Sequence, residues 1–282
     1  MENVVISDLE KFSEIKRKIL LGGFDNLHVI SDFDRTLTHV FLQDGSEVSS
    51  ILSILRDENH LTPDYSDKAR SLFKKYHQIE IDHTISMDEK KKAMEEWWTK
   101  HSELLIESGL NKSDLLKVAK SKRIRFREKT LESMILLNNN NVPFVILSAS
   151  GLGDISIIDT LNANKMHFLN VDVISNKYIW DDRGYAIDYV KPHIHTFNKN
   201  ETVIKESSFY PKIINRKNVI LLGDSLGDVK MVEGFEYDNL LKIGFLNFHV
   251  EKDLEEYKKH YDVIITNDSS MEFVYDLLKE IK

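Results

Sequence analysis

The sequence predicts an α/β fold in which a helical segment interrupts a parallel sheet after its first strand. Short apolar runs rich in β-branched residues recur along the chain with helical patterns between them, which is typical of βαβ units. These runs span residues 27–30, 142–147, 171–174, 219–222, 240–243 and 263–265. Between about residues 46 and 136 the strand patterns nearly vanish. We therefore expect a core made of residues 1–45 and 137–282 and a helical domain made of residues 46–136.

Local signals predict where two of the helices begin. A capping box that starts at Ser7, followed by a stop signal at Gly22-Gly23, predicts a helix over residues 8–21. A second capping box starts at Ser86 and predicts a helix that runs to about Ser108 within the helical domain.

Composition and charge exclude several classes of function. The chain has 46 acidic and 38 basic residues, and this net charge of −8 disfavours binding to nucleic-acid polymers. There are no cysteines, which excludes disulfides and thiolate chemistry. The N-terminus carries acidic residues where a signal peptide carries basic ones, and no apolar run approaches the roughly 20 residues that span a bilayer. We expect a cytoplasmic monomer with neither a membrane nor a nucleic-acid partner.

Polar clusters follow three of the predicted strands, at the point where each strand ends. Asp32-Phe33-Asp34 follows the first strand, Ser148–Gly151 follows the second and Gly223–Asp228 follows a later one. Because the carboxyl ends of parallel strands meet at one edge of a sheet, these side chains should share a crevice. Crowded carboxylates repel one another unless a cation lies among them, and hard oxygen ligands favour Mg²⁺. The sequence therefore predicts a magnesium site formed by Asp32, Asp34, Asp224 and Asp228.

Two carboxylates two residues apart can divide the work of phosphoester hydrolysis. A turn beginning at Asp34 would bring both Asp32 and Asp34 into the crevice. One could then attack phosphorus while the other protonates the leaving oxygen and later activates water. A loop with solvated acids is the alternative for this pair alone. The Thr36-Leu37-Thr38 that follows and the later clusters favour the catalytic interpretation.

These residues resemble a known family. The segment Ile30–Thr38 resembles the first motif of the haloacid dehalogenase superfamily, Ser148 fits the second motif and Gly223–Asp228 fits the fourth. The third motif is a lysine, and His195–Lys199 is similar to its form in cytosolic 5′-nucleotidases that act on pyrimidine or 7-methylguanosine monophosphates. The similarity extends over Tyr76–Asp82, Glu96–Lys100, Leu221–Gly234, Leu241–Asn247 and the final helix. It implies a Rossmann-like parallel-sheet core of the haloacid dehalogenase type with an inserted α-helical cap.

The resemblance implies a magnesium-dependent 5′-nucleotidase and assigns roles to its carboxylates. Asp32 would attack phosphorus and form an aspartyl-phosphate. Asp34 would act as general acid and base and give its backbone carbonyl to Mg²⁺. Asp224 would be a metal ligand, and Asp228 would support the metal or its waters.

Ser148 and Lys199 would hold the transferring phosphoryl group, where a hydroxyl and a cation stabilise charge. The second motif departs from the usual form by one extra residue. Matching the motif through the strand at Pro143 selects Ser148 as the phosphate ligand, whereas matching it through Gly151-Leu152-Gly153-Asp154 leaves Ser150 as a rival. A second departure is Arg127-Glu128-Lys129, where the family tends to have glycine as the third residue, and this makes the local turn uncertain.

Two residues of the helical domain would recognise the base. Glu80 matches a glutamate that accepts hydrogen bonds from base N–H groups, and Trp98 matches an aromatic residue that stacks on the base. In the family this position is tryptophan in the branch that prefers 7-methylguanosine monophosphate and tyrosine in the pyrimidine branch. A methylated guanine is cationic, and indole binds cations at about 0.5–2 kcal/mol. The alternative is that Trp97 and Trp98 both belong to the domain's core, although adjacent residues cannot share one helix face.

We expect hydrolysis of 7-methylguanosine monophosphate, of CMP and UMP, or of all three. One alternative is a capped phosphatase for another small phosphomonoester such as phosphoserine. Another is a nucleotide-binding protein without catalysis, but such a protein could lose Asp32 or Lys199, and this chain keeps both. A phosphotransferase side activity remains an open possibility.

Overall fold

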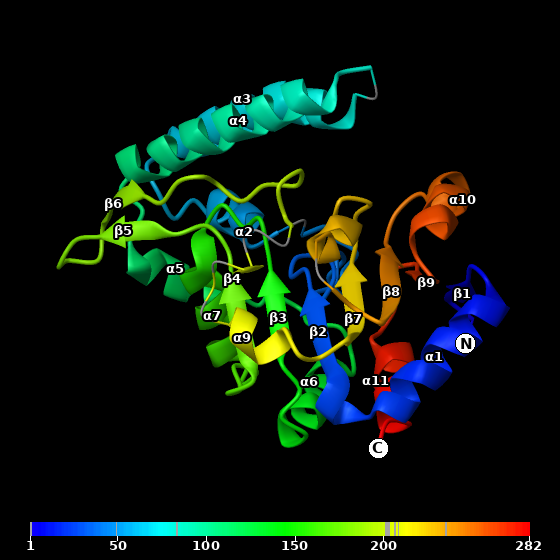
Figure 1. Cartoon of the computed structure of the whole chain (residues 1–282). Helices are drawn as coiled ribbons and strands as arrows, with labels where there is room; N and C mark the ends of the chain where they lie inside the picture. The colour runs from blue at the N-terminus through cyan, green and yellow to red at the C-terminus, as the bar shows by residue number, and fades with distance from the viewer. Residues whose placement is uncertain are drawn as a thin grey trace.

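The computed structural model describes residues 2–48, 50–82, 84–200, 204–205, 207, 209–234 and 236–282, and a seven-stranded sheet lies at its centre (Figure 1). The strand order is β1-β9-β8-β7-β2-β3-β4, and all neighbours pair in parallel except β1 and β9. The strands are β1 (Val4–Ile6), β2 (Leu27–Ser31), β3 (Phe144–Leu147), β4 (Val171–Ile174), β7 (Asn218–Gly223), β8 (Asn239–Leu246) and β9 (Val263–Thr266). The predicted parallel sheet is confirmed.

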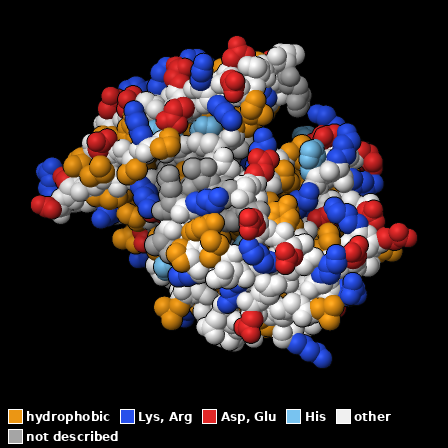
Figure 2. Space-filling view, viewed as in Figure 1, with side chains coloured by type: hydrophobic (Ala, Val, Ile, Leu, Met, Phe, Trp, Pro, Cys, Tyr) orange, Lys and Arg blue, Asp and Glu red, His pale blue; other side chains and the backbone are white. Residues whose placement is uncertain are grey.

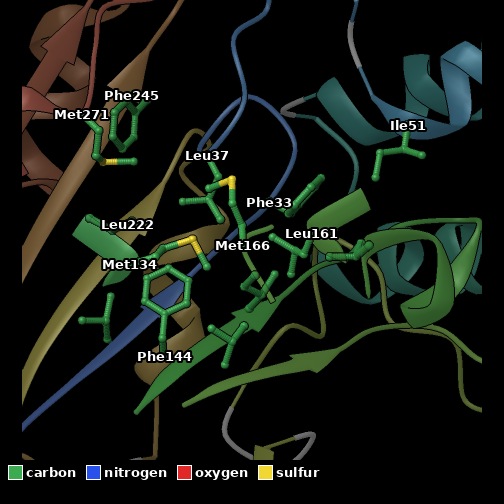
Figure 3. Close-up of a cluster of buried hydrophobic side chains, with 14 of the residues drawn as sticks. Phe33, Leu37, Ile51, Met134, Phe144, Leu161, Met166, Leu222, Phe245 and Met271 are labelled. Carbon is green, nitrogen blue, oxygen red and sulfur yellow. The ribbon is translucent and has the colours of Figure 1, made fainter. Parts of the chain in front are cut away.

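Helices cover both faces of the sheet because successive strand residues point to opposite sides. Val29 belongs to one apolar cluster and Ile30 to the other. The first cluster also takes residues from α1 (Leu9–Gly22), α6 (Thr130–Asn139), α7 (Gly153–Ala163) and α11 (Glu272–Lys279). Figure 3 shows part of it, with Met134 of α6 beside Phe144 and Leu222 of the sheet. The second cluster takes residues from α9 (Tyr210–Ile213), η2 (Asp228–Val232) and α10 (Val250–His260).

The helices predicted after the first strand are present. A short turn, η1 (Phe24–Asn26), precedes β2, and the helices after it are α2 (Ile51–Asp57), α3 (Tyr65–Ile81), α4 (Met87–Glu107) and α5 (Lys112–Ala119). The capping box at Ser86 forms as predicted, since its hydroxyl accepts from the Glu89 amide. In Figure 1 α3 and α4 run side by side above the carboxyl edge of the sheet. The strand ends and this helical layer therefore face each other.

The limits of the helical domain are a proposal. The predicted boundary between residues 136 and 137 falls inside α6. Because α6 packs against α11 on the face of the core, we now propose that the helical domain ends before α6. Likewise α5 packs against α7 of the core, which ties the base of the helical domain to the sheet.

Three local features were not predicted. Asp8, and not Ser7, caps α1 by accepting from the Lys11 amide, because the Ser7 hydroxyl instead donates to the Tyr261 carbonyl at 2.6 Å. The short antiparallel edge strand β1 was missed. So was the hairpin formed by β5 (Tyr178–Trp180) and β6 (Ala186–Tyr189), which projects beside the helical layer in Figure 1. Strands of three or four residues carry too little alternation to be recognised.

The surface is mixed in charge. Figure 2 shows lysine and arginine side chains interspersed with aspartate and glutamate over the visible face. Within the described ranges, no helix combines the length and the apolar character needed to cross a membrane.

Candidate active site

Asp32 lies at the end of β2, where the sheet positions it beside a buried lysine. Its backbone amide donates to the Leu222 carbonyl of the neighbouring strand at 3.0 Å, which fixes the start of the loop. The Lys199 ammonium forms an ion pair with Asp32 and lies 3.1 Å from Asp228 Oδ1. All three charged side chains are buried. Burial disfavours the Lys199 ammonium, but Asp228 and Asp32 outweigh it and raise the pKa of Lys199 above its ordinary value.

Three of the four predicted metal ligands converge. Asp32, Asp224 and Asp228 each offer a carboxylate oxygen within 4.8 Å of the others. Three hard oxygen donors at this spacing fit Mg²⁺. The Asp34 carboxylate is not in this group, because its Oδ1 accepts from the Ile51 amide at 3.0 Å, at the start of α2. Asp34 therefore lies apart from the three carboxylates that could share a metal.

The carboxylates of this cluster are hard to ionise without a cation. Burial raises the pKa of Asp32 to about 7, with further increases from Asp228 and Asp224 against the lowering effect of Lys199. Burial likewise raises the pKa of Asp224 to about 6. A divalent cation would remove this penalty. Burial, together with the charge of Asp32, raises the pKa of Asp34 to about 7, which suits a group that must give and take a proton near neutral pH.

Arg35 is a charged neighbour that sequence reasoning did not single out. Its Nε lies 3.1 Å from Asp224 Oδ2, and its backbone adopts the left-handed conformation with φ of 62°. Arg127 fixes this turn, because its guanidinium donates to the carbonyls of Arg35 at 2.7 Å and Thr36 at 2.9 Å and to the side chain of Asn247. The only sequence signal for Arg35 was its place between two motif residues.

Ser148 and Ser150 both line the cleft, as the second motif requires. Ser148 Oγ accepts from the Ser150 amide at 3.2 Å, and Ser150 Oγ accepts from the Leu152 amide at 3.3 Å. In both contacts the hydroxyl is the acceptor, so neither contact uses the hydroxyl's own proton. Both serines remain candidates for the phosphate ligand.

A cleft of about 810 Å³ connects these groups with the helical layer. Its walls include Glu80 and Trp98, the two residues predicted to recognise a base. Glu80 Oε1 accepts from the Thr196 hydroxyl at 2.8 Å, and Glu80 Oε2 lies 3.1 Å from His77 Nδ1. Burial raises the pKa of Glu80, but the hydrogen bonds from His77 and Thr196 outweigh it and leave the pKa below its ordinary value. Glu80 is thus ionised and oriented.

Trp98 belongs to a row of four nearly parallel rings, three of which line the cleft. Tyr76, Trp97, Trp98 and His101 follow one another with ring centroids 5.5–6.0 Å apart and interplanar angles of 7–10°. Trp97 is buried and Trp98 is half-buried, and both contribute to the wall of the cleft. The Trp98 ring also lies against Gly151, so close that a Cβ there would be 2.5 Å from Trp98 Cζ3. The helical layer therefore touches the loop of Ser148–Gly151 through Trp98.

Solved structures share this architecture. The crystal structure of cytosolic 5′-nucleotidase IIIB bound to cytidine superposes with a TM-score of 0.90 at 31% identity, covering 99% of this chain and 94% of that chain. A phosphoserine phosphatase in its apo form gives a TM-score of 0.55 at 19% identity, which shows a shared fold. The haloacid dehalogenase-type fold with inserted helices is confirmed.

Proteins of similar sequence are 5′-nucleotidases as well. The 7-methylguanosine phosphate-specific 5′-nucleotidase of Gallus gallus is 34% identical over 279 residues, which cover 99% of this chain and 96% of the relative. The human enzyme of the same name is 34% identical over 272 residues, which cover 96% of this chain and 90% of the relative. The sequence profile described as pyrimidine 5′-nucleotidase (UMPH-1) matches residues 35–282. The chain belongs to the pyrimidine 5′-nucleotidase (UMPH-1) family.

Proposed function

We propose that this protein is a magnesium-dependent 5′-nucleotidase that hydrolyses nucleoside 5′-monophosphates through an aspartyl-phosphate on Asp32. The observation that carries this proposal is that two groups of residues line one cleft. Asp32, Lys199 and the carboxylate cluster line it together with Glu80 and Trp98. A nucleoside monophosphate carries a phosphate and a base on one ribose, so it could contact both groups of residues at once.

The protein's own residues support each chemical step. Asp32 attacks phosphorus, and its new bond to phosphorus replaces the bond to the 5′-oxygen of the nucleoside. Asp34 gives its proton to that oxygen, and the nucleoside leaves. Asp34 then takes a proton from water as the water attacks the aspartyl-phosphate, which restores Asp32 and releases phosphate.

Other residues hold the transferring group during these steps. Lys199 and a serine hydroxyl of the phosphate-binding loop, at Ser148 or Ser150, bind the phosphoryl oxygens. Asp32, Asp224 and Asp228, with the Asp34 carbonyl, would hold Mg²⁺, which when bound neutralises charge on the phosphoryl oxygens. The fit of Mg²⁺ to this site rests on the three carboxylate donors and on the raised pKa values of Asp32 and Asp224.

The preferred base is proposed to be 7-methylguanine, with cytosine and uracil as further substrates. An indole face offers a cationic ring about 0.5–2 kcal/mol of attraction. Glu80, kept ionised by His77 and Thr196, accepts hydrogen bonds from base N–H groups. The relatives named for 7-methylguanosine phosphate support this order, and the cytidine bound to cytosolic 5′-nucleotidase IIIB supports the pyrimidine substrates. A cytoplasmic location and a monomeric state complete the proposal.

The test is a substrate panel with matched variants. Purified enzyme should release phosphate from 7-methylguanosine monophosphate, CMP and UMP faster than from phosphoserine, and EDTA should abolish turnover. Asp32→Asn should lose metal-dependent hydrolysis of p-nitrophenyl phosphate, and residual turnover would exclude Asp32 as nucleophile. Trp98→Ala should remove the preference for the methylated base, and an unchanged preference would exclude stacking at Trp98.

A further inference from the structure

Two tyrosines at the C-terminal end of α10 reach the loop Gly223–Asp228. Figure 1 shows α10 beside β8 and β9, at the same edge of the sheet as this loop. The helix packs on the sheet with residues that lie four or three apart and so share one helix face, namely Val250, Leu254, Tyr257 and Tyr261. The last two carry hydroxyl groups. The packed face of α10 therefore ends in two polar groups that need partners.

Both hydroxyls donate to consecutive carbonyls of the loop. Tyr257 Oη lies 2.6 Å from the carbonyl oxygen of Asp224, and the Tyr261 hydroxyl donates to the carbonyl of Ser225. The two rings stack with their centroids 5.6 Å apart, which fixes the spacing of the hydroxyls. Burial, together with the nearby carboxylates, raises the pKa of both tyrosines above its ordinary value. Both hydroxyls therefore keep the proton that they donate.

Ser225 connects the second of these contacts to Asp228. The Ser225 amide nitrogen lies 2.9 Å from Asp228 Oδ2, and the Ser225 hydroxyl lies 2.8 Å from the same oxygen. The other oxygen of this carboxylate, Oδ1, lies 3.1 Å from the Lys199 ammonium. Because Tyr261 holds Ser225, it also helps to orient the Asp228 carboxylate.

Two glycines side by side in the sheet make room for this arrangement. Gly223 at the end of β7 pairs with Gly244 of β8, so both face the same side of the sheet. A Cβ on Gly223 would lie 2.5 Å from Asp228 Cβ, and a Cβ on Gly244 would lie 2.7 Å from the Tyr261 ring. The Asp228 side chain and the Tyr261 ring therefore lie directly against the sheet, each over one glycine.

We propose that these two tyrosines are positioning residues that hold Asp224 and Asp228 in the geometry that binds Mg²⁺. The inference rests on the proposed function, in which these carboxylates and Asp32 hold the metal. Neither Tyr257 nor Tyr261 is part of the wall of the cleft, so both act through the loop. Groups that orient metal ligands change metal affinity by about 10–100-fold when they are removed.

The expected effect is on metal affinity and not on the chemical step. Without a tyrosine hydroxyl, the loop would spend part of its time in conformations in which the carboxylates of Asp224 and Asp228 do not meet Asp32. The apparent Kd for Mg²⁺ then rises by the inverse of the fraction of molecules in the competent conformation. Saturating Mg²⁺ selects that conformation, so the fully loaded enzyme should react as before.

Isothermal titration calorimetry with MgCl₂ tests the inference without any substrate. Tyr257→Phe and Tyr261→Phe should each raise the Kd for Mg²⁺ about tenfold. Tyr275→Phe is the matched control, because it removes the hydroxyl of a tyrosine on α11 whose ring lies against the ammonium groups of Lys129 and Lys279, and it should bind Mg²⁺ as the wild type does. An unchanged Kd in both α10 variants would overturn the inference and leave the proposed metal site standing. A wild type that binds no Mg²⁺ would overturn both.

Steady-state kinetics separate positioning from stability. Each α10 variant should need about ten times more Mg²⁺ for the half-maximal rate of p-nitrophenyl phosphate hydrolysis, with kcat at saturating Mg²⁺ within about twofold of the wild type. A lowered kcat with an unchanged Mg²⁺ requirement would show that the tyrosines support only the fold, and would overturn the inference. Tyr257 is half-buried and Tyr261 is buried, so Tyr257→Phe keeps the test available if Tyr261→Phe does not fold.

Discussion

Replacing Gly151 with alanine isolates the contact between the helical layer and the phosphate-binding loop. An added Cβ would lie 2.5 Å from Trp98 Cζ3 and 3.1 Å from both Trp98 Cη2 and Leu52 Cδ2. Gly151 is not among the residues with positive φ, so alanine brings no backbone strain of its own. The substitution is therefore a steric wedge between Trp98 and the loop that holds Ser148 and Ser150.

The size of the change in stability and in KM depends on whether Trp98 or the loop moves to make room for the added methyl group. Overpacking by one methyl group costs about 1–3 kcal/mol when neighbours must shift. If the Trp98 ring moves away, the stacking energy of about 0.5–2 kcal/mol for a cationic base is lost. That loss corresponds to a rise in KM for 7-methylguanosine monophosphate of about two- to thirtyfold. The small substrate p-nitrophenyl phosphate has no base to stack, and its KM should change much less.

The assay is a double-mutant cycle read by urea unfolding and by steady-state kinetics. Gly151→Ala should cost stability and raise KM in the Trp98 enzyme. In a Trp98→Leu background the added methyl meets a smaller, flexible side chain, so both penalties should shrink. Equal penalties in the two backgrounds would show that the methyl group acts elsewhere, and the contact between Trp98 and Gly151 would lose its assigned role.

Three other substitutions probe separate parts of the molecule. Burial lowers the pKa of His28 from 6.5 to about 4. The unfolded chain therefore binds more protons in this range, and the free energy of unfolding falls as the pH drops. Between pH 7 and pH 5 the free energy of unfolding of His28→Leu, measured in urea, should fall by about 2 kcal/mol less than that of the wild type. Asp34→Asn should release a burst of p-nitrophenol and then stall, and should hydrolyse CMP about 10²–10⁴-fold more slowly; a normal steady state would refute its role. Arg127→Met should cost about 3 kcal/mol in urea unfolding because it leaves buried carbonyls and Asp268 without their cation, and a loss below 1 kcal/mol would refute this.

The sheet and the carboxylate cluster could be predicted because their signals are local. Each buried strand is a short β-branched run, and the polar residue that ends it is adjacent in sequence. Asp32, Ser148 and Asp224 each follow such a run, so the topology alone brings them to one edge. The capping box at Ser86 is local in the same sense and was found.

Features that depend on partners distant in sequence were not predictable. Ser7 has the spacing of a helix cap, but its hydroxyl is taken by the carbonyl of Tyr261, 254 residues away. The pairing of Arg35 with Asp224 and the contact of His193 with α4 are equally invisible before the fold brings these segments together. Sequence patterns report which face a residue prefers, and tertiary structure decides which partner it meets there.

The segment from Thr196 to Lys199 connects the proposed base-binding residue Glu80 with the proposed nucleophile Asp32. Thr196 donates to Glu80, which we propose reads the base, and three residues later Lys199 pairs with Asp32. One short stretch of backbone therefore sets the distance between the group that recognises the substrate and the group that attacks it. On the proposed function, a nucleotide whose base binds Glu80 would have its phosphate held near Asp32, and such fixed placement lowers the barrier to reaction. A smaller phosphate ester would contact Lys199 but not Glu80, so its reaction should be accelerated less.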